Sequence, residues 1–281
     1  MKKAKIAFIG GGNMARSIVA GLIKDAYDPH QIWVADRNLD KCQALEQTYQ
    51  VHTTSDLSQA ITVADIVVLA VKPQNMRSLA VEIGRQIQQQ QPLLISVAAG
   101  IKLSALQSWF GQATAIVRAM PNMPAILQAG ATGLFANEQT STEQKSLAEQ
   151  IMRAVGIVLW LKNEKLIDAV ASVAGSGPAY YFYIMEIMQN IAEDMELSPE
   201  EATLLAKQTI FGAAKLALET NEPISSLRQQ VTSKGGSTAA ALAVMQKNDL
   251  HGIFEKALYA SNKRADELAQ MFGETKQLDT E

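Results

Sequence analysis

The chain has 281 residues, of which 48% are hydrophobic, enough for a substantial core and two domains. The formal net charge of −3 gives no basic excess, so nucleic acid is not an expected partner. No apolar stretch reaches the roughly 18 residues of a membrane span, and the apolar run near the N-terminus is too short for a signal peptide. The single cysteine, Cys42, cannot form an intrachain disulfide, and the three histidines lack metal-ligand spacing, so we expect a cytoplasmic protein without a metal site.

A glycine-rich turn follows the first predicted strand, which spans residues 5–9. It reads Gly10-x-Gly12-x-x-Ala15, and apolar residues at helical spacing begin at Met14. The first glycine allows a tight turn, the second lets a pyrophosphate approach the backbone, and a small third residue lets helix and strand pack closely. The N–H groups that open the new helix would face the phosphates. The turn predicts dinucleotide binding, and the alternative is an ordinary glycine-rich connection.

The second predicted strand, residues 31–36, ends in Asp36, about 20 residues beyond the glycine turn. A carboxylate at this place binds the ribose 2′-hydroxyl of NAD, whereas the adjacent Arg37 can hold the 2′-phosphate of NADP. The two residues therefore leave the choice of cofactor open. Their alternative roles are a helix N-cap for Asp36 and a solvated surface charge for Arg37.

The rest of the first half alternates strands with helices, which predicts a doubly wound α/β domain. A short helix over residues 55–61 is expected to be capped by Ser55. Lys72, at the end of a buried strand, lies where a ligand of such a sheet binds, although a surface lysine fits equally well. The further predicted elements are strands over residues 51–53, 65–71, 93–99, 113–119, 132–135 and 157–161, and helices over 39–49 and 142–154.

Strand signals stop near Leu161, and the second half is predicted to be all-helical. We place the domain boundary between residues 1–162, which bind the dinucleotide, and 163–281, which form a helical dimerisation and substrate domain. The small-residue faces favour helices that pack between subunits, and hence a homodimer, over a monomeric bundle. Helices are expected over residues 163–173, from about 179 to 195, about 199 to 218, 223–230, 238–246 and 250–272, with a disordered tail over 273–281.

A second glycine loop, Thr232-Ser233-Lys234-Gly235-Gly236-Ser237-Thr238, precedes one of these helices. Two glycines expose the backbone, and the N–H groups at a helix N-terminus bind carboxylate or phosphate. The loop is a candidate for a second anion site, separate from the site of the dinucleotide. The alternative is that Ser237 or Thr238 simply caps the helix.

Five sequence blocks, taken in order, carry a resemblance to the pyrroline-5-carboxylate reductase family over nearly the whole chain. They are FIGGGNMA (residues 8–15), AVKP (70–73), RAMPNMPA (118–125), GSGPAY (175–180) and VTSKGGSTAAAL (231–242). Two positions depart from the pattern: Lys234 stands where the family usually has proline, and Met123 where it usually has threonine. Lys234 adds charge beside the expected carboxylate site and bears on substrate selectivity.

The resemblance implies a Rossmann-type domain followed by an all-helical dimerisation domain. It implies an NAD(P)H-dependent oxidoreductase that reduces the cyclic imine of pyrroline-5-carboxylate to L-proline, the last step of proline biosynthesis, with NADPH as cofactor and NADH as an option. Thr238 is the implied catalytic residue, because its hydroxyl would bond the ring nitrogen and relay a proton. Substrate binding is expected at Ser233, Gly235, Gly236, Ser237 and Thr238.

The expected cofactor-binding residues are Gly10, Gly12, Asn13, Met14, Asp36, Arg37, Asn38, Ala70, Val71, Lys72, Pro73 and Ala98. The resemblance places the first four at the pyrophosphate, Arg37 and Asn38 at the adenosine ribose, and Ala98 near the nicotinamide. It also implies a homodimer whose partner subunit completes the active site, and assembly of dimers into decamers.

Two other functions stay open. One is a related imine reductase or a β-hydroxyacid dehydrogenase, for which Asn163-Glu164-Lys165 offers a lysine in unsuitable surroundings. The other is a non-catalytic NAD(P)-binding sensor: Lys234 leaves room for it, whereas Gly235, Gly236 and Thr238 argue against it. No acid of suitable pKa stands out as proton donor, which leaves water, or Thr238 acting with water.

Overall fold

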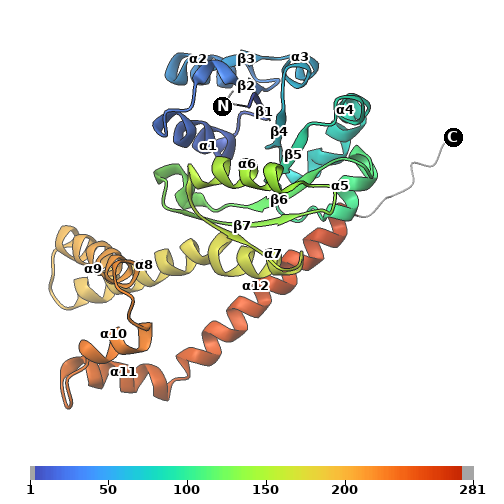
Figure 1. Cartoon of the computed structure of the whole chain (residues 1–281). Coiled ribbons are helices and arrows are strands. Elements are labelled where there is room, and N and C mark those ends of the chain that lie inside the picture. The colour runs from blue at the N-terminus through green and yellow to red at the C-terminus, as the bar shows by residue number, and fades with distance from the viewer. Residues whose placement is uncertain (1–3, 274–281) are drawn as a thin grey trace. The chain divides into compact units, whose positions relative to one another are not determined.

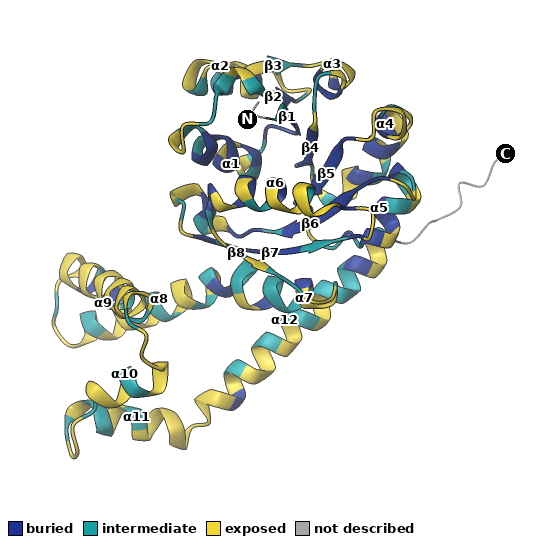
Figure 2. Cartoon of the chain, viewed as in Figure 1, coloured by how far each residue is buried: buried dark blue, intermediate teal, exposed yellow. Residues whose placement is uncertain are grey.

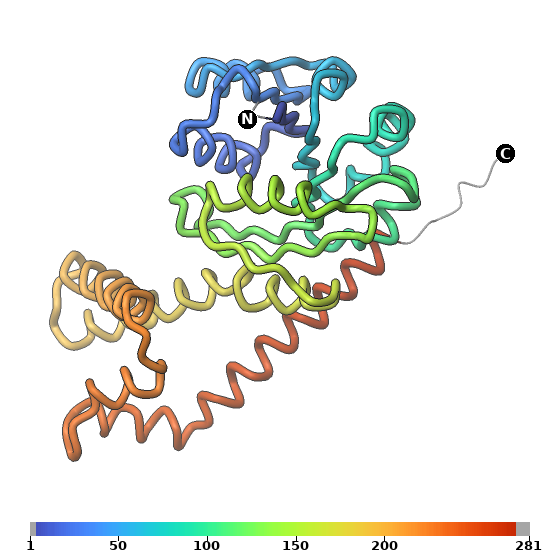
Figure 3. The backbone as a smooth tube through the Cα atoms, in the orientation of Figure 1, coloured from blue at the N-terminus to red at the C-terminus, as the bar shows by residue number. Residues whose placement is uncertain are grey.

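The computed structural model describes residues 4–273, so all of the predicted tail except Gly273 lies outside the described residues. Residues 4–176 and 261–273 form one compact unit, called here the first unit, and residues 177–260 form the second unit. The course of the chain through both is drawn in Figure 1 and, as a tube, in Figure 3. The chain therefore leaves the first unit after Ser176 and re-enters it at Ser261, and the hydroxyls of these two residues lie 3.2 Å apart.

The first unit is built on one eight-stranded sheet with the order β3-β2-β1-β4-β5-β6-β7-β8. The first six strands run parallel, and β7 is antiparallel to β6. β1 and β4 are buried along their whole lengths, as their unbroken apolar sequences predict for a sheet covered on both faces. The strands are β1 (Ile6–Ile9), β2 (Ile32–Ala35), β3 (His52–Thr54), β4 (Ile66–Leu69), β5 (Leu93–Ser96), β6 (Ile116–Met120), β7 (Gly130–Ala136) and β8 (Gly156–Trp160).

Helices cover both faces of this sheet and enclose two separate cores. On one face, α1 (Asn13–Lys24), α2 (Leu39–Tyr49) and α6 (Thr142–Arg153) bury residues such as Ile18, Leu45 and Ile151. On the other face, α3 (Leu57–Thr62), α4 (Met76–Gln90) and α5 (Leu103–Phe110) bury residues such as Ile61 and Ile83. Figure 2 shows the strands as the most continuously buried part of the chain. The predicted doubly wound fold is confirmed.

The direction of β7 has a simple cause. Only the single turn η3 (Met123–Leu127) and a few flanking residues connect β6 to β7. A parallel pair needs a crossover of a dozen or more residues, so the chain returns antiparallel instead. The strand itself was predicted from its apolar residues, and its direction follows from the connection.

Two local expectations were wrong. Asp56, and not Ser55, caps α3, because its carboxylate accepts the N–H groups of Ser58 (2.9 Å) and Gln59 (3.4 Å). The single helix expected over residues 163–173 is a short α7 (Leu166–Val170) that continues into a π-helical turn, η4 (Ala171–Gly175). A 3.6-residue periodicity does not reveal a wider turn of this kind.

The second unit consists of helices only, as predicted. Among its helices, α9 has the N-terminus that follows the known capping rules most fully: Ser198 and Glu201 form a capping box, and Pro199 takes the first helical position. α8 packs on α9, and the last helix, α12, runs from the second unit into the first. The helices are α8 (Gly177–Asp194), α9 (Pro199–Glu219), α10 (Ile224–Gln230), α11 (Ser237–Lys247) and α12 (Leu250–Gly273). Across residues 4–273, no helix is both long and apolar enough to cross a membrane.

Candidate active site

The turn after β1 requires glycine at its first position. Gly10 has a φ of +104°, and a Cβ on it would lie 2.7 Å from the carbonyl oxygen of Ala70. The Gly10 N–H donates to the Ala35 carbonyl at 2.8 Å. The turn is therefore fixed between the ends of β2 and β4, at the edge where an open parallel sheet binds its ligands.

The N-terminus of α1 is open toward a ligand. Gly12 is its N-cap residue, no side chain among residues 4–273 caps the helix, and a Cβ on Gly12 would meet nothing within 4 Å. Asn13 and Met14 form the first turn, and Ala15, the small third residue of the motif, is completely buried. Unpaired N–H groups at the positive end of a helix, facing free space, fit the diphosphate of a dinucleotide.

The carboxylate of Asp36 forms hydrogen bonds with the backbone of the glycine turn and of the residues that follow β2. Its Oδ2 accepts the Gly11 N–H at 2.8 Å, and its Oδ1 accepts the Asn38 N–H at 2.9 Å. Lys41 Nζ lies 3.5 Å from Oδ2, and only 15% of the Asp36 side chain is exposed. Burial raises the pKa of Asp36, but the hydrogen bonds from Asn38 and Gly11 and the charge of Lys41 outweigh it and hold the pKa below its ordinary value. The carboxylate ties the end of β2 to the glycine turn.

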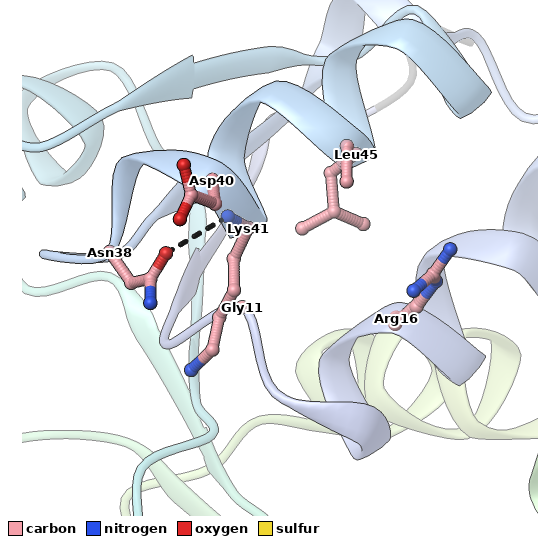
Figure 4. Close-up of a pocket in the computed structure, with 7 residues that line it drawn as sticks. Gly11, Arg16, Asn38, Asp40, Lys41 and Leu45 are labelled. Carbon is pink, nitrogen blue, oxygen red and sulfur yellow. Dashed lines mark hydrogen bonds between the residues drawn. The ribbon is translucent and has the colours of Figure 1, made fainter.

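A cavity of about 230 Å³ lies beside this loop, between α1 and α2 (Figure 4). It has a cationic side chain from each helix, Arg16 and Lys41, and Asn38 caps α2 by accepting the Lys41 N–H at 3.1 Å. Arg37 does not line the cavity: its guanidinium pairs with Glu82 at 2.5 Å, and its side chain is 78% exposed. Arg16 and Lys41 were not predicted as site residues, because their only signal in the sequence was their closeness in the chain to Gly12 and Asp36. The lining residues are Gly11, Arg16, Asn38, Asp40, Lys41, Ala44 and Leu45.

The ends of β4 and β5 complete this edge. Ala70 and Val71 follow β4, Lys72 is exposed, and Pro73 begins the short turn η2 (Pro73–Asn75). After β5 the Val97 N–H donates to the Leu69 carbonyl at 3.2 Å, and Ala98 is buried one residue further on. The predicted cofactor residues thus lie on consecutive strand ends of one unit: β2, β1, β4 and β5.

The second glycine loop lies in the second unit, before α11. Gly236 is the N-cap residue of that helix, and neither Ser237 nor Thr238 caps it, so the capping alternative was wrong. Gly235 has a φ of +73°, and the Gly236 N–H donates to the Ser233 carbonyl at 3.0 Å. No side chain in the described part of the chain caps α11, and Thr238 stands in its first turn. This arrangement suits a carboxylate.

The predicted proline-rich loop after β6 is fixed by Asn122. Its side-chain NH₂ donates to the Ala174 carbonyl at 2.9 Å, and its side-chain oxygen accepts the Ala131 N–H at 2.9 Å. Both ends of the amide are therefore used inside the protein, and Met123 beside it is 72% exposed. No metal-binding cluster of histidine, cysteine or acidic residues occurs among residues 4–273.

Comparison with known proteins identifies the family. The family pattern described as pyrroline-5-carboxylate reductase dimerisation matches residues 164–268, and that described as NADP oxidoreductase, coenzyme F420-dependent, matches residues 5–100. The pyrroline-5-carboxylate reductase of Pseudomonas aeruginosa is 41% identical over 274 residues, which are 98% of this chain and 100% of that protein. The chain belongs to the pyrroline-5-carboxylate reductase family. The reductase of Haemophilus influenzae is 39% identical and also matches over its whole length.

Solved structures agree with this family and fold. A pyrroline-5-carboxylate reductase from Coxiella burnetii has a TM-score of 0.91 and 49% identity, covering 94% of this chain and 98% of that one. The Plasmodium falciparum enzyme, solved with NADP bound, has a TM-score of 0.83 and 24% identity, covering 96% and 99% of the two chains, and supports the fold alone. The resemblance seen in the sequence blocks, the Rossmann-type sheet and the helical domain are confirmed. The family is one of NAD(P)H-dependent reductases.

Proposed function

We propose that this chain reduces pyrroline-5-carboxylate to L-proline with NAD(P)H, and that Thr238 acts at the reacting nitrogen. One observation carries the proposal beyond family membership: each unit presents a glycine loop that opens onto an uncapped helix N-terminus, at Gly12 and at Gly236. A dinucleotide and a substrate carboxylate need one such site each. The first site suits NADPH, with NADH as the option.

On the cofactor side, the chain supplies binding and orientation. The N–H groups of Asn13 and Met14 would hold the diphosphate, and Arg37 and Asn38 the adenosine end, with Lys41 close by. Ala70, Val71, Lys72 and Pro73 would flank the dinucleotide along β4, and Ala98 would lie at the nicotinamide. When bound, NAD(P)H supplies the hydride that reduces the imine carbon.

On the substrate side, the residues from Ser233 to Thr238 would fix the carboxylate. The N–H groups of the first turn of α11 would attract the negative charge, and Gly235, on which a Cβ would meet nothing within 4 Å, leaves room for it beside the backbone. The hydroxyl of Thr238 in that first turn would bond the ring nitrogen. It would pass a proton to this nitrogen as the imine carbon becomes tetrahedral, with water restoring the hydroxyl proton. Catalysis here is mainly positioning of the imine carbon.

The alternatives are less well supported by the surroundings of their key residues. A β-hydroxyacid dehydrogenase would need the stretch around Lys165 for chemistry, yet its neighbour Glu164 accepts both the Leu103 N–H (2.6 Å) and the Arg118 guanidinium (2.5 Å). A sensor without turnover would have no need of a second anion loop. Lys234 is exposed within that loop, and we propose that it adds attraction for an acidic substrate.

We also propose a homodimer formed by the second unit. Among residues 177–260, all of them described, the only buried hydrophobic side chains are Ala202 and Ala206. Large apolar side chains on α8 and α9, including Phe182, Ile191 and Phe211, are exposed in the single chain. Assembly of dimers into decamers remains an extension of this proposal. A cytoplasmic location fits the buried free thiol of Cys42.

The test follows NAD(P)H absorbance with purified protein and pyrroline-5-carboxylate, for the wild type, Thr238→Ala and Lys234→Pro. We expect rapid oxidation by the wild type and a loss of about a hundredfold or more in kcat for Thr238→Ala, as for other positioned proton-transfer groups. Ser225→Ala, which removes an exposed hydroxyl on α10, is the matched control and should keep wild-type rates.

The same cuvettes compare NADH with NADPH. Activity of Lys234→Pro without activity of the wild type would mean that Lys234 has changed the substrate. If all variants bind cofactor but none oxidises it, the reductase proposal fails and the sensor replaces it.

A further inference from the structure

The loop after β5, residues 97–102, borders the ligand edge of the first unit. It starts beside β4, where the Val97 N–H bonds to Leu69, and it ends at Lys102, the N-cap residue of α5. Ala98 lies within it and Ile101 is completely buried. Because a dinucleotide crosses such an edge from β2 over β1 toward β4 and β5, this loop would meet its nicotinamide end and no other part of it.

The last turns of α12 press directly on this loop. Gly100 has a φ of +72°, and a Cβ on it would lie 3.3 Å from Phe272 Cδ2 and 3.6 Å from the backbone nitrogen of Ala269. Ala269 is 1% exposed, and Phe272 packs against the core on the α4–α5 side of the sheet. Figure 1 shows this end of α12 beside α5. A helix from the C-terminal end of the chain thus packs against one side of the loop.

Charged groups fasten the loop on both sides of its end. Lys102 Nζ donates to Asp266 Oδ1 on α12 at 3.0 Å, and the hydrogen bond and charge of Lys102 hold the pKa of Asp266 below its ordinary value. At the next residue, the Leu103 N–H donates to Glu164 Oε1 at 2.6 Å, and Glu164 is held in turn by the buried Arg118. No side chain of the loop itself caps α5, so these outside groups determine where the loop ends.

We propose that Asp266, with Phe272, is a positioning residue for hydride transfer: the end of α12 clamps residues 98–102 in the conformation that receives the nicotinamide ring. Neither residue touches the cofactor in this proposal, and both act through the loop. The clamp sets the fraction of molecules whose nicotinamide subsite is formed, and the affinity for the intact dinucleotide falls in proportion to that fraction. The proposal rests on the proposed function, since it requires Ala98 to lie at the nicotinamide.

The clamp can be separated from general stability by comparing two ligands. NADPH carries the nicotinamide, whereas 2′-phospho-ADP-ribose lacks it. The affinity for 2′-phospho-ADP-ribose should therefore not depend on the conformation of the loop. We expect Asp266→Asn to lower the affinity for NADPH by roughly two- to fivefold in calorimetric titration, which corresponds to the loss of one exposed ion pair. Gly100→Ala, which forces a Cβ into a left-handed conformation against α12, should weaken it by about tenfold. Both variants should bind 2′-phospho-ADP-ribose as the wild type does.

The matched control is Glu267→Gln. Glu267 follows Asp266 on the same helix, but its partners Arg264 (2.9 Å) and Lys263 (4.0 Å) are on that helix too, so it does not touch the loop. This variant should bind both ligands normally, and Asp266→Glu should restore most of the NADPH affinity.

Three outcomes overturn the clamp: unchanged NADPH affinity in Asp266→Asn and Gly100→Ala, equal loss of both ligands, or the same loss in Glu267→Gln. Failure of the proposed function gives a different result, because the wild type itself would then fail to bind NADPH or to turn over the imine.

Discussion

Asp36→Ala tests whether this carboxylate binds the cofactor or builds the loop that binds it. In the structure both of its oxygens accept backbone N–H groups, from Gly11 and Asn38, and Lys41 lies beside one of them. The Asn38 N–H is exposed and can turn to water after the substitution. The Gly11 N–H is partly buried and loses its acceptor.

The magnitude follows from that difference. A hydrogen bond to a charged acceptor contributes about 1.5–3 kcal/mol net, so losing the partly buried one should cost about 2 kcal/mol in the free energy of unfolding. The lost hydrogen bond also no longer stabilises the glycine turn in the conformation that binds the dinucleotide. We expect the affinity for NADH and for NADPH to fall equally, by up to about thirtyfold.

Urea unfolding without ligand and calorimetric titration with each dinucleotide make the two measurements. Glu143→Ala is the control, because Glu143 is an exposed acid in the first turn of α6 and does not line the cavity beside the glycine turn. Loss of NADH binding with NADPH binding kept, at unchanged stability, would refute the reasoning and make Asp36 the ribose ligand first expected. The lowered pKa of Asp36 also predicts a pH dependence. The stability that Asp36 contributes is fully present above the ordinary carboxyl pKa of about 3.9 and is lost as the pH falls through the lower pKa of the folded state.

Three other substitutions probe charges of the first unit. Glu164→Ala should destabilise the protein by about 3–5 kcal/mol in urea unfolding, because it removes the carboxylate with which the buried Arg118 forms its ion pair, and a loss under 1 kcal/mol would contradict this. Burial, with the nearby Asp266 and Glu164, raises the pKa of Asp168 against the attraction of Arg118 and Lys102. The contribution of Asp168 to stability therefore falls as the pH rises from about 3.9 through that raised value, and the melting temperature of Asp168→Asn relative to the wild type should rise between pH 3 and pH 7. Lys41 lines the cavity beside the glycine turn, where its charge would attract the 2′-phosphate that NADPH carries and NADH lacks. Lys41→Met should therefore lower the affinity for NADPH by up to about fivefold and leave the affinity for NADH unchanged, and an equal loss of both would contradict this role.

The elements of this fold could be read from the sequence where one local pattern decided them. The strand, glycine turn and helix around Gly10 were visible because a buried parallel strand is uniformly apolar and the first position of the turn admits only glycine. The capping box at Ser198 was equally local. The partners of side chains were not visible. Asp36 had the right position for a ribose ligand, and only the folded loop shows its hydrogen bonds to backbone groups on both sides.

The same limit applied to contacts between distant segments. Gly100 and Phe272 lie 172 positions apart in the chain (272 − 100), and no periodicity relates them. Arg118 gave no signal as a buried cation, because its ion pair with Glu164 forms only when β6 and the residues before α7 are brought together. Such contacts depend on tertiary packing, which the hydrophobic pattern of single elements does not encode.

The second unit shows why the substrate half of the site should depend on assembly. Its 84 residues bury almost no side chain larger than alanine, although α8 and α9 together carry exposed Tyr, Phe, Ile, Leu and Met. A helical unit of this size needs apolar burial to offset the conformational entropy that folding removes, and within one chain it lacks that burial. The Thr238 loop is part of this unit, so its geometry should become fixed only when a second copy covers those helices. Substrate binding would then require the proposed dimer. The cofactor edge would form without it, because it belongs to the first unit, which has two hydrophobic cores of its own.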